Sequence, residues 1–154
     1  MPATLATKDI GFVPSEGFGT LLSNGLPQWL ALPIAFGTAD AATLFTVPAG
    51  VRMFVHRMFW EVSVGFTGGV SSTIGVSSDA TGYTTKGDLL GGASGDAAAT
   101  LVAGLTGGTL GAKFGSNGVI IIPATKILRF DRITSAFTAG SGFVHAQVSF
   151  LPTS

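Results

Sequence analysis

The chain has 154 residues, a length that fits one domain. Its net charge is zero, and charged residues make up only 10% of the chain, against about 25% in an average soluble domain. No cysteine is present, which excludes disulfides, thiolate nucleophiles and Cys-ligated zinc. So few charges favour a surface that is covered by protein partners, although a neutral surface of small residues that simply stays soluble would have the same composition.

The N-terminal 30 residues show no sustained hydrophobic period, yet they contain several large apolar side chains. Such side chains rarely stay exposed to water in a disordered segment. We therefore expect an N-terminal arm over residues 1–30, which either packs across its own domain or reaches onto a neighbour. Phe12, Phe18 and Trp29 are the candidate partner contacts in this arm.

Residues 31–154 are predicted to form a single β-sandwich domain. Residues 30–36 form a short strand, and Pro33 within it favours an edge position. Residues 43–47 are β-branched and aromatic, which is typical of a strand. The Pro48-Ala49-Gly50 sequence then predicts a turn, since proline presets φ and glycine supplies conformational freedom.

The next predicted strand, residues 51–66, is long, and its apolar pattern has two phases. A change of face near residues 53–58 indicates either a bulge or a strand that passes between two sheets. The first phase contains Val51, Met53 and Val55, and the second contains Phe54, Met58, Trp60, Val62, Val64 and Phe66.

Turn residues divide the following segment into shorter elements. Gly68-Gly69 predicts a turn before a strand at residues 70–76, and residues 77–97 read as a long loop. Residues 100–103 and 110–114 are weaker strand candidates. They precede an Asn-Gly hairpin turn at Ser116-Asn117-Gly118.

The C-terminal part contains three further predicted strands, at residues 119–122, 126–137 and 143–151. Gly140 and Gly142 are expected to form the turn before the last one. Alternation in this last strand predicts an inward face and an outward face. Val144, Ala146, Val148 and Phe150 are expected inward, and His145, Gln147 and Ser149 outward.

No window keeps a convincing helical period, and several strands alternate with Gly, Pro and Asn turns. The fold class is therefore predicted to be all-β, an antiparallel β-sandwich or jelly roll with an irregular N-terminal arm.

The titratable residues indicate no catalytic site. The two histidines, His56 and His145, lack the carboxylate spacing of a metal site or of a base–nucleophile pair. Glu61 and Asp131 lie on long strands and could be sheet neighbours, as a glycosidase pair would require. Cross-strand ion pairing is the preferred interpretation. Arg57 would pair with Glu61, and Arg129 or Arg132 with Asp131.

Three acids, Asp79, Asp88 and Asp96, share one predicted loop, and calcium takes oxygen ligands from such loops. Their spacing does not match the EF-hand template, and Asp in a Gly-rich turn explains them equally simply. We predict no metal, no cofactor and no catalytic residue. The absence of a dense basic cluster predicts no nucleic-acid partner. The absence of an apolar run of about 18 residues predicts no membrane span.

Short motifs within residues 43–90 resemble a recurrent pattern of tailed-phage virion proteins. The motifs are Thr46-Val47-Pro48-Ala49-Gly50-Val51, Gly65-Phe66-Thr67-Gly68-Gly69, Ile74-Gly75-Val76-Ser77-Ser78-Asp79 and Gly82-Tyr83. In size and composition the chain is similar to capsid decoration (cement) proteins of the jelly-roll type.

This resemblance implies a structural virion protein without enzymatic activity. It would be a homotrimer on the capsid exterior that clamps adjacent subunits of the major capsid protein. Two alternatives stay open: a phage tail, fibre or receptor-binding jelly-roll module, and a carbohydrate-binding module. The aromatic residues, 12 Phe against two Trp and one Tyr, weigh mildly against sugar binding, because Trp and Tyr suit wet sites better.

Overall fold

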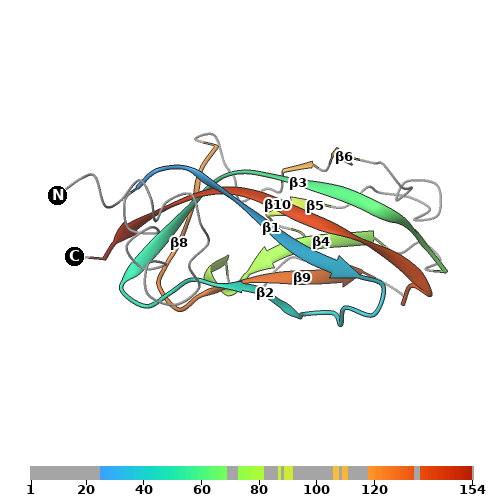
Figure 1. Cartoon of the computed structure of the whole chain (residues 1–154). Coiled ribbons are helices and arrows are strands. Elements are labelled where there is room, and N and C mark those ends of the chain that lie inside the picture. The colour runs from blue at the N-terminus through green and yellow to red at the C-terminus, as the bar shows by residue number, and fades with distance from the viewer. Residues whose placement is uncertain are drawn as a thin grey trace.

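Two antiparallel β-sheets pack face to face in this computed structural model (Figure 1). The structure describes residues 25–68, 73–81, 87, 89–91, 106–107, 109–110, 118–133 and 136–153. The first sheet has the order β1-β10-β3-β6, with β8 also paired to β3, and the second has the order β2-β9-β4-β5-β7. The strands are β1 (Gln28–Ala35), β2 (Thr43–Thr46), β3 (Val51–Thr67), β4 (Thr73–Ser78), β5 (Leu90–Gly91), β6 (Thr106–Gly107), β7 (Thr109–Leu110), β8 (Ile120–Ile122), β9 (Ile127–Ile133) and β10 (Ala139–Pro152).

The strand pairing is nested. If the short strands β6 and β7 are set aside, the first described strand pairs with the last, β1 with β10, and the second with the last but one, β2 with β9. The series continues inward with β3–β8 and β4–β5. The pairs β10–β3 and β9–β4 then join these into two sheets. This is the order of a jelly roll, so the predicted all-β antiparallel sandwich is confirmed.

Strand β1 lies at the edge of the first sheet, where Pro33 was predicted to lie. It pairs on one side with β10, and Pro33 is opposite Phe143. The strand begins at Gln28, so Trp29 is part of the sheet although it belongs to the segment assigned to the arm. Residues 1–24, including Phe12 and Phe18, lie outside the described residues.

A bulge in β3 explains its two-phased sequence. Val55 is opposite Val148, whereas Arg57 is opposite Gln147, so His56 is the additional residue. The bulge shifts the phase of the side chains by one residue. As a result β3 stays in one sheet along its whole length and does not pass between sheets. The buried side chains before the bulge are Val51, Met53 and Val55, and those after it are Met58, Trp60, Val62 and Phe66.

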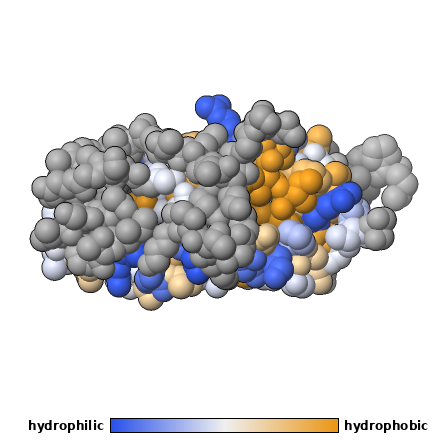
Figure 2. Space-filling model, turned by 180° about the vertical axis from the view of Figure 1, so that it is seen from behind, coloured by the Kyte–Doolittle hydropathy of each residue, from blue (hydrophilic) through white to orange (hydrophobic). Residues whose placement is uncertain are grey.

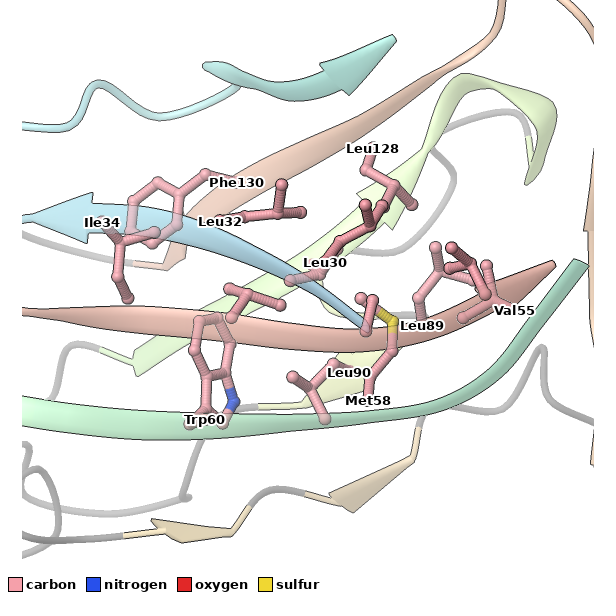
Figure 3. Close-up of a cluster of buried hydrophobic side chains, with 14 of the residues drawn as sticks. Leu30, Leu32, Ile34, Val55, Met58, Trp60, Leu89, Leu90, Leu128 and Phe130 are labelled. Carbon is pink, nitrogen blue, oxygen red and sulfur yellow. The ribbon is translucent and has the colours of Figure 1, made fainter. Parts of the chain in front are cut away.

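Side chains from both sheets form one core (Figure 3). Leu30, Leu32 and Ile34 of β1 point from the first sheet toward Leu128 and Phe130 of β9 in the second. The predicted inward face of β10 is confirmed, because Val144, Ala146, Val148 and Phe150 are all fully buried.

A hydrogen bond also joins the two sheets. The indole Nε1 of Trp60, on β3, donates to the carbonyl oxygen of Gly91, on β5, at 3.2 Å. Trp60 is among the largest buried side chains, so without this bond its indole N–H would be buried with no hydrogen-bond acceptor.

The predicted turn at Gly140 and Gly142 is wrong, because both glycines lie inside β10. The register with β3 shifts twice between Ala139 and Gly142. At Gly142 a Cβ atom would overlap the carbonyl oxygen of Glu61. Gly140 has a φ of 127°, and a Cβ atom there would overlap Phe66. The glycines therefore mark a close approach of two backbones rather than a reversal of the chain.

The other predicted element boundaries agree with the structure only in part. The turn before β3 is confirmed, with Gly50 at a φ of 80°. Strand β9 ends at Ile133, earlier than the predicted residue 137. The predicted loop at 77–97 contains the end of β4, a 3₁₀ turn at Asp79–Thr81 and the short strand β5.

Some predictions fall outside the described residues. These are the strand at 100–103, residues 70–72 and 111–114 of two others, and the turn residues Gly69, Ser116 and Asn117. No helix in the described part of the chain is long and apolar enough to cross a membrane.

Gly142→Ala tests the close approach of β10 and β3. We expect it to lower the free energy of unfolding by about 2 kcal/mol, because the methyl group has no space beside the backbone of Glu61. Gly37→Ala is the matched control. Its Cβ atom would meet nothing within 4 Å, so a change within about 0.5 kcal/mol is expected. Denaturant unfolding of both variants measures the difference, and equal stabilities would contradict the close approach.

Candidate contact surface on the first sheet

The described candidate contact residue, Trp29, lies on the outer face of the first sheet. Its neighbours along β1, Leu30 and Leu32, are buried, so strand alternation turns Trp29 outward. The residue is 47% exposed. Its indole ring packs edge-to-face on Phe59 of β3, with the ring centroids 5.6 Å apart.

The register of β1, β10 and β3 arranges the surrounding side chains in rows across the sheet. Each row takes one outward residue from each strand, and β10 supplies the middle one. In strand order, the first row is Trp29, Gln147 and Arg57, the second is Ala31, His145 and Phe59, and the third is Pro33, Phe143 and Glu61.

His145 is held at the centre of these rows. Its imidazole stacks on the ring of Phe59, with centroids 4.8 Å apart and an interplanar angle of 17°. Its Nε2 atom lies 2.5 Å from Oε2 of Glu61. The ring of Phe143 lies 6.0 Å away, in a tilted arrangement. We call Trp29, Phe59, Phe143 and His145 the aromatic patch, and its rings are ordered by contacts within the sheet itself.

The aromatic patch has the character of a protein contact surface. Trp29 and Phe143, 47% and 36% exposed, are large apolar side chains that water solvates poorly. Aromatic residues are enriched at protein interfaces, where they bury much area at a low cost in conformational entropy. Arg57 and Glu61 flank the patch on β3 with opposite charges, so it has a polar rim as well.

A second apolar region lies at the other edge of the first sheet. Ile121 of β8 and the preceding Val119 are exposed, and Ile121 is opposite Phe54 of β3. The guanidinium carbon of Arg52 lies 5.7 Å from the centroid of the Phe54 ring, a cation–π contact. Seen from behind, the molecule shows strongly apolar residues gathered on one part of its described surface (Figure 2).

The other histidine takes part in the bulge. Nε2 of His56 lies 2.9 Å from the hydroxyl oxygen of Ser149 on β10. A serine nucleophile activated by histidine must reach a substrate, but Ser149 is only 6% exposed. The hydrogen bond therefore links β3 to β10 at the additional residue. The hydroxyl group of Ser149 is too buried to act as a nucleophile.

The carboxylates Glu61 and Asp131 are not sheet neighbours, because Glu61 lies on β3 of the first sheet and Asp131 on β9 of the second. The predicted pairing of Glu61 with Arg57 is wrong, since its partner is His145. The predicted pairing of Asp131 with Arg129 is confirmed, with Nε of Arg129 2.9 Å from Oδ1.

Asp131 is fully buried on the outer face of the second sheet. Its Oδ2 atom accepts a hydrogen bond of 2.9 Å from the backbone N–H of Gly87. The Nε atom of Arg129 also lies 3.1 Å from the hydroxyl oxygen of Ser77 on β4. Gly87 lies directly against β4, because a Cβ atom on Gly75 would lie 2.8 Å from Cα of Gly87. Asp131 therefore fixes residue 87 against the sheet.

Asp79, one of the three acids considered for calcium, already has protein partners. Its Oδ1 atom accepts a hydrogen bond of 2.8 Å from the backbone N–H of Ile127, and its Oδ2 atom lies 3.6 Å from Nζ of Lys126. Asp88 and Asp96 lie outside the described residues. Among the residues that are described, no group of three or more His, Cys, Asp or Glu side chains could hold a metal ion.

Sequence reasoning missed most of the aromatic patch. The alternation at residues 143–151 correctly predicted His145 on the polar side of its strand. Its contact with Glu61, however, joins residues that are 84 positions apart. Only the strand order and register bring them together, and the sequence contained no signal for either.

Comparisons with known proteins leave the family open. No protein-family model matches the chain, and no curated protein matches it. Among solved structures, a chain described as "Cyanophage Pam1 capsid asymmetric unit" is 21% identical, with 91% of each chain covered and a TM-score of 0.47. A likeness at this identity and TM-score establishes neither a shared fold nor a shared function. The chain's own structure defines it as an all-β jelly-roll protein with an exposed aromatic surface.

Asp131→Ala tests the buried ion pair. We expect it to lower the free energy of unfolding by about 3 kcal/mol, because the N–H of Gly87 and the guanidinium of Arg129 lose a buried acceptor. Asp40→Ala is the control, because the hydrogen bond from the Arg132 backbone to Asp40 is exposed, and a loss of no more than about 1 kcal/mol is expected there. Equal losses in thermal or denaturant unfolding would contradict the structural role of Asp131.

Proposed function

We propose that the chain is a structural protein of a phage virion. In this proposal it binds the outside of the capsid, stabilises contacts between subunits of the major capsid protein, and uses the aromatic patch as one of its protein contact surfaces. The homotrimeric state that the sequence resemblance implies is part of the same proposal.

The observation that carries the proposal is the exposure of the aromatic patch. Its four rings belong to three adjacent strands and contact one another, so they form one surface rather than scattered side chains. Soluble monomers rarely expose a contiguous apolar surface, and where one is exposed it commonly marks an interaction site. The surface is already ordered, and binding therefore costs little additional conformational entropy.

The low charge of the chain supports a role in assembly. Each charge that enters an interface must lose its water, and an unpaired one is costly. With only 10% charged residues, this chain has few such charges to desolvate. If three copies act together, even weak contacts add up through multivalency, which suits a protein that clamps a shell.

The sequence resemblance supports the virion assignment. Its first motif forms the turn before β3, where Gly50 has a positive φ. Its second ends β3, where Gly68 has a φ of 86°. Its third forms β4 and leads into the 3₁₀ turn at Asp79. The motifs thus coincide with the ends of jelly-roll strands, the role they have in the proteins that the chain resembles.

A carbohydrate-binding role is the second candidate, because one observation favours it. The exposed ring of Trp29 lies on the same face as the polar side chains Gln147 and Glu61, and sugars bind through ring stacking combined with hydrogen bonds. Binding in a glycan array that Trp29→Ala abolishes would favour this role, and also the related one of a receptor-binding module, over shell stabilisation.

Phe143→Ala tests the proposed contact with the capsid. We expect roughly 30-fold weaker binding to capsids that lack this chain, because a buried aromatic anchor contributes about 2 kcal/mol or more. Co-sedimentation across a range of concentrations measures the binding. Phe36→Ala is the matched control, since Phe36 is 46% exposed and lies outside the patch, after the end of β1.

The control should bind like the unchanged protein. Equal binding by both variants would contradict the role of the patch. A chain that fails to bind any capsid preparation would contradict the assignment to the capsid.

A further inference from the structure

We propose that a second copy of this chain packs on the aromatic patch, face to face, about a two-fold axis that crosses the strands along the row of Ala31, His145 and Phe59. The contact would be isologous, so the same surface is used by both copies. A second copy on the patch would displace the capsid from it, so this inference and the capsid contact proposed above exclude each other at this surface, and the experiments below distinguish them.

The geometry follows from the register of the three strands. Relative to the middle row, the row of Trp29, Gln147 and Arg57 lies two residues away along the strands on one side. The row of Pro33, Phe143 and Glu61 lies two residues away on the other side. A two-fold axis along the middle row therefore exchanges the two outer rows and keeps each strand above its own copy.

Charge complementarity is what selects a second copy as the occupant. Arg57 and Glu61 lie on the same strand, two residues before and two residues after Phe59. The two-fold axis places Arg57 of each copy opposite Glu61 of the other, which makes two symmetric ion pairs. Arg57 is exposed and has no ion-pair partner in the described part of the chain, whereas the side chain of Glu61 is 44% exposed and already contacts His145.

The apolar positions match under the same rotation. Trp29 of one copy lies opposite Pro33 of the other, so a flat ring meets a flat pyrrolidine. Phe143 lies opposite Gln147, and each residue of the middle row lies opposite the same residue of the other copy. Sheets that pack face to face are about 10 Å apart, a distance that side chains of this size fill from both sides.

An axis along β10 fits less well. It would place Arg57 over Trp29 of the second copy, which is favourable, but it would also place Glu61 over Pro33. That carboxylate would be removed from water without a cation on the other copy, a costly arrangement. The axis across the strands is therefore the one that the charges favour.

Ala31→Cys tests the contact, because the chain contains no other cysteine and Ala31 lies on the proposed axis. A bismaleimide long enough to bridge sheets about 10 Å apart should link two copies. A denaturing gel then shows a cross-linked dimer. Thr46→Cys, exposed on β2 of the other sheet, is the control and should remain monomeric on the gel.

Charge reversal then tests the register in the Ala31→Cys background. Arg57→Glu places two carboxylates opposite each other, and Glu61→Arg places two guanidinium groups opposite each other. Each variant alone should lose at least tenfold in cross-linked dimer. An equimolar mixture of the two should restore it, because every facing pair then has opposite charges.

A mixture that fails to restore the dimer, or an Ala31→Cys protein that does not cross-link at all, would overturn the inference. Thermal unfolding of each variant confirms that it is folded before the comparison. If Phe143→Ala weakens capsid binding while cross-linking is absent, the proposed function stands and the two-fold contact is wrong. If cross-linking follows the predicted pattern and the chain does not bind capsids, the two-fold contact stands and the proposed function is wrong.

Discussion

The long pairing of β3 with β10 depends on one additional residue, His56. Without it, the apolar side chains before and after this point would lie on opposite faces of the sheet, and half of them would be exposed to water. The bulge keeps both groups in the core, Val55 before it and Met58 after it. The same shift turns Arg57, Phe59 and Glu61 outward. At this point of the ladder, the buried face and the outer face are therefore both consequences of the bulge at His56.

Strand β10 supplies the regular half of this arrangement. Its strict alternation buries Val144, Ala146 and Val148 and presents Phe143 and His145 on the opposite face. Because β10 lies between β1 and β3, its outward side chains lie beside those of both neighbours. Phe59 then touches Trp29 and His145 at once. Ring contacts thus hold the side chains of this surface in place across three strands, and such pre-ordering lowers the entropic cost of binding.

The sequence allowed the local features of this fold to be predicted, because they arise from neighbouring residues. Pro33 at an edge, the turn at Gly50 and the inward face of β10 all follow from φ preferences or from alternation. The non-local features could not be predicted. Gly142 reads as a turn residue until the backbone of Glu61 is known to lie against it, and the partner of Glu61 depends on a register between strands that are far apart in the chain. Among the described candidate contacts, Trp29 was found from its size and apolar character, but the patch around it required the sheet.

In a chain with so few charges, the position of each charge carries much of the specificity of a contact. Apolar packing is non-directional, and an aromatic face alone could bind a partner in several orientations. Arg57 and Glu61 lie on one strand at equal distances from Phe59 and have opposite signs. Such a pair adds little affinity at a solvated rim, but it disfavours every orientation that brings like charges together. The aromatic rings would thus supply the binding free energy, and the two charges would decide which surface, in which direction, the patch accepts.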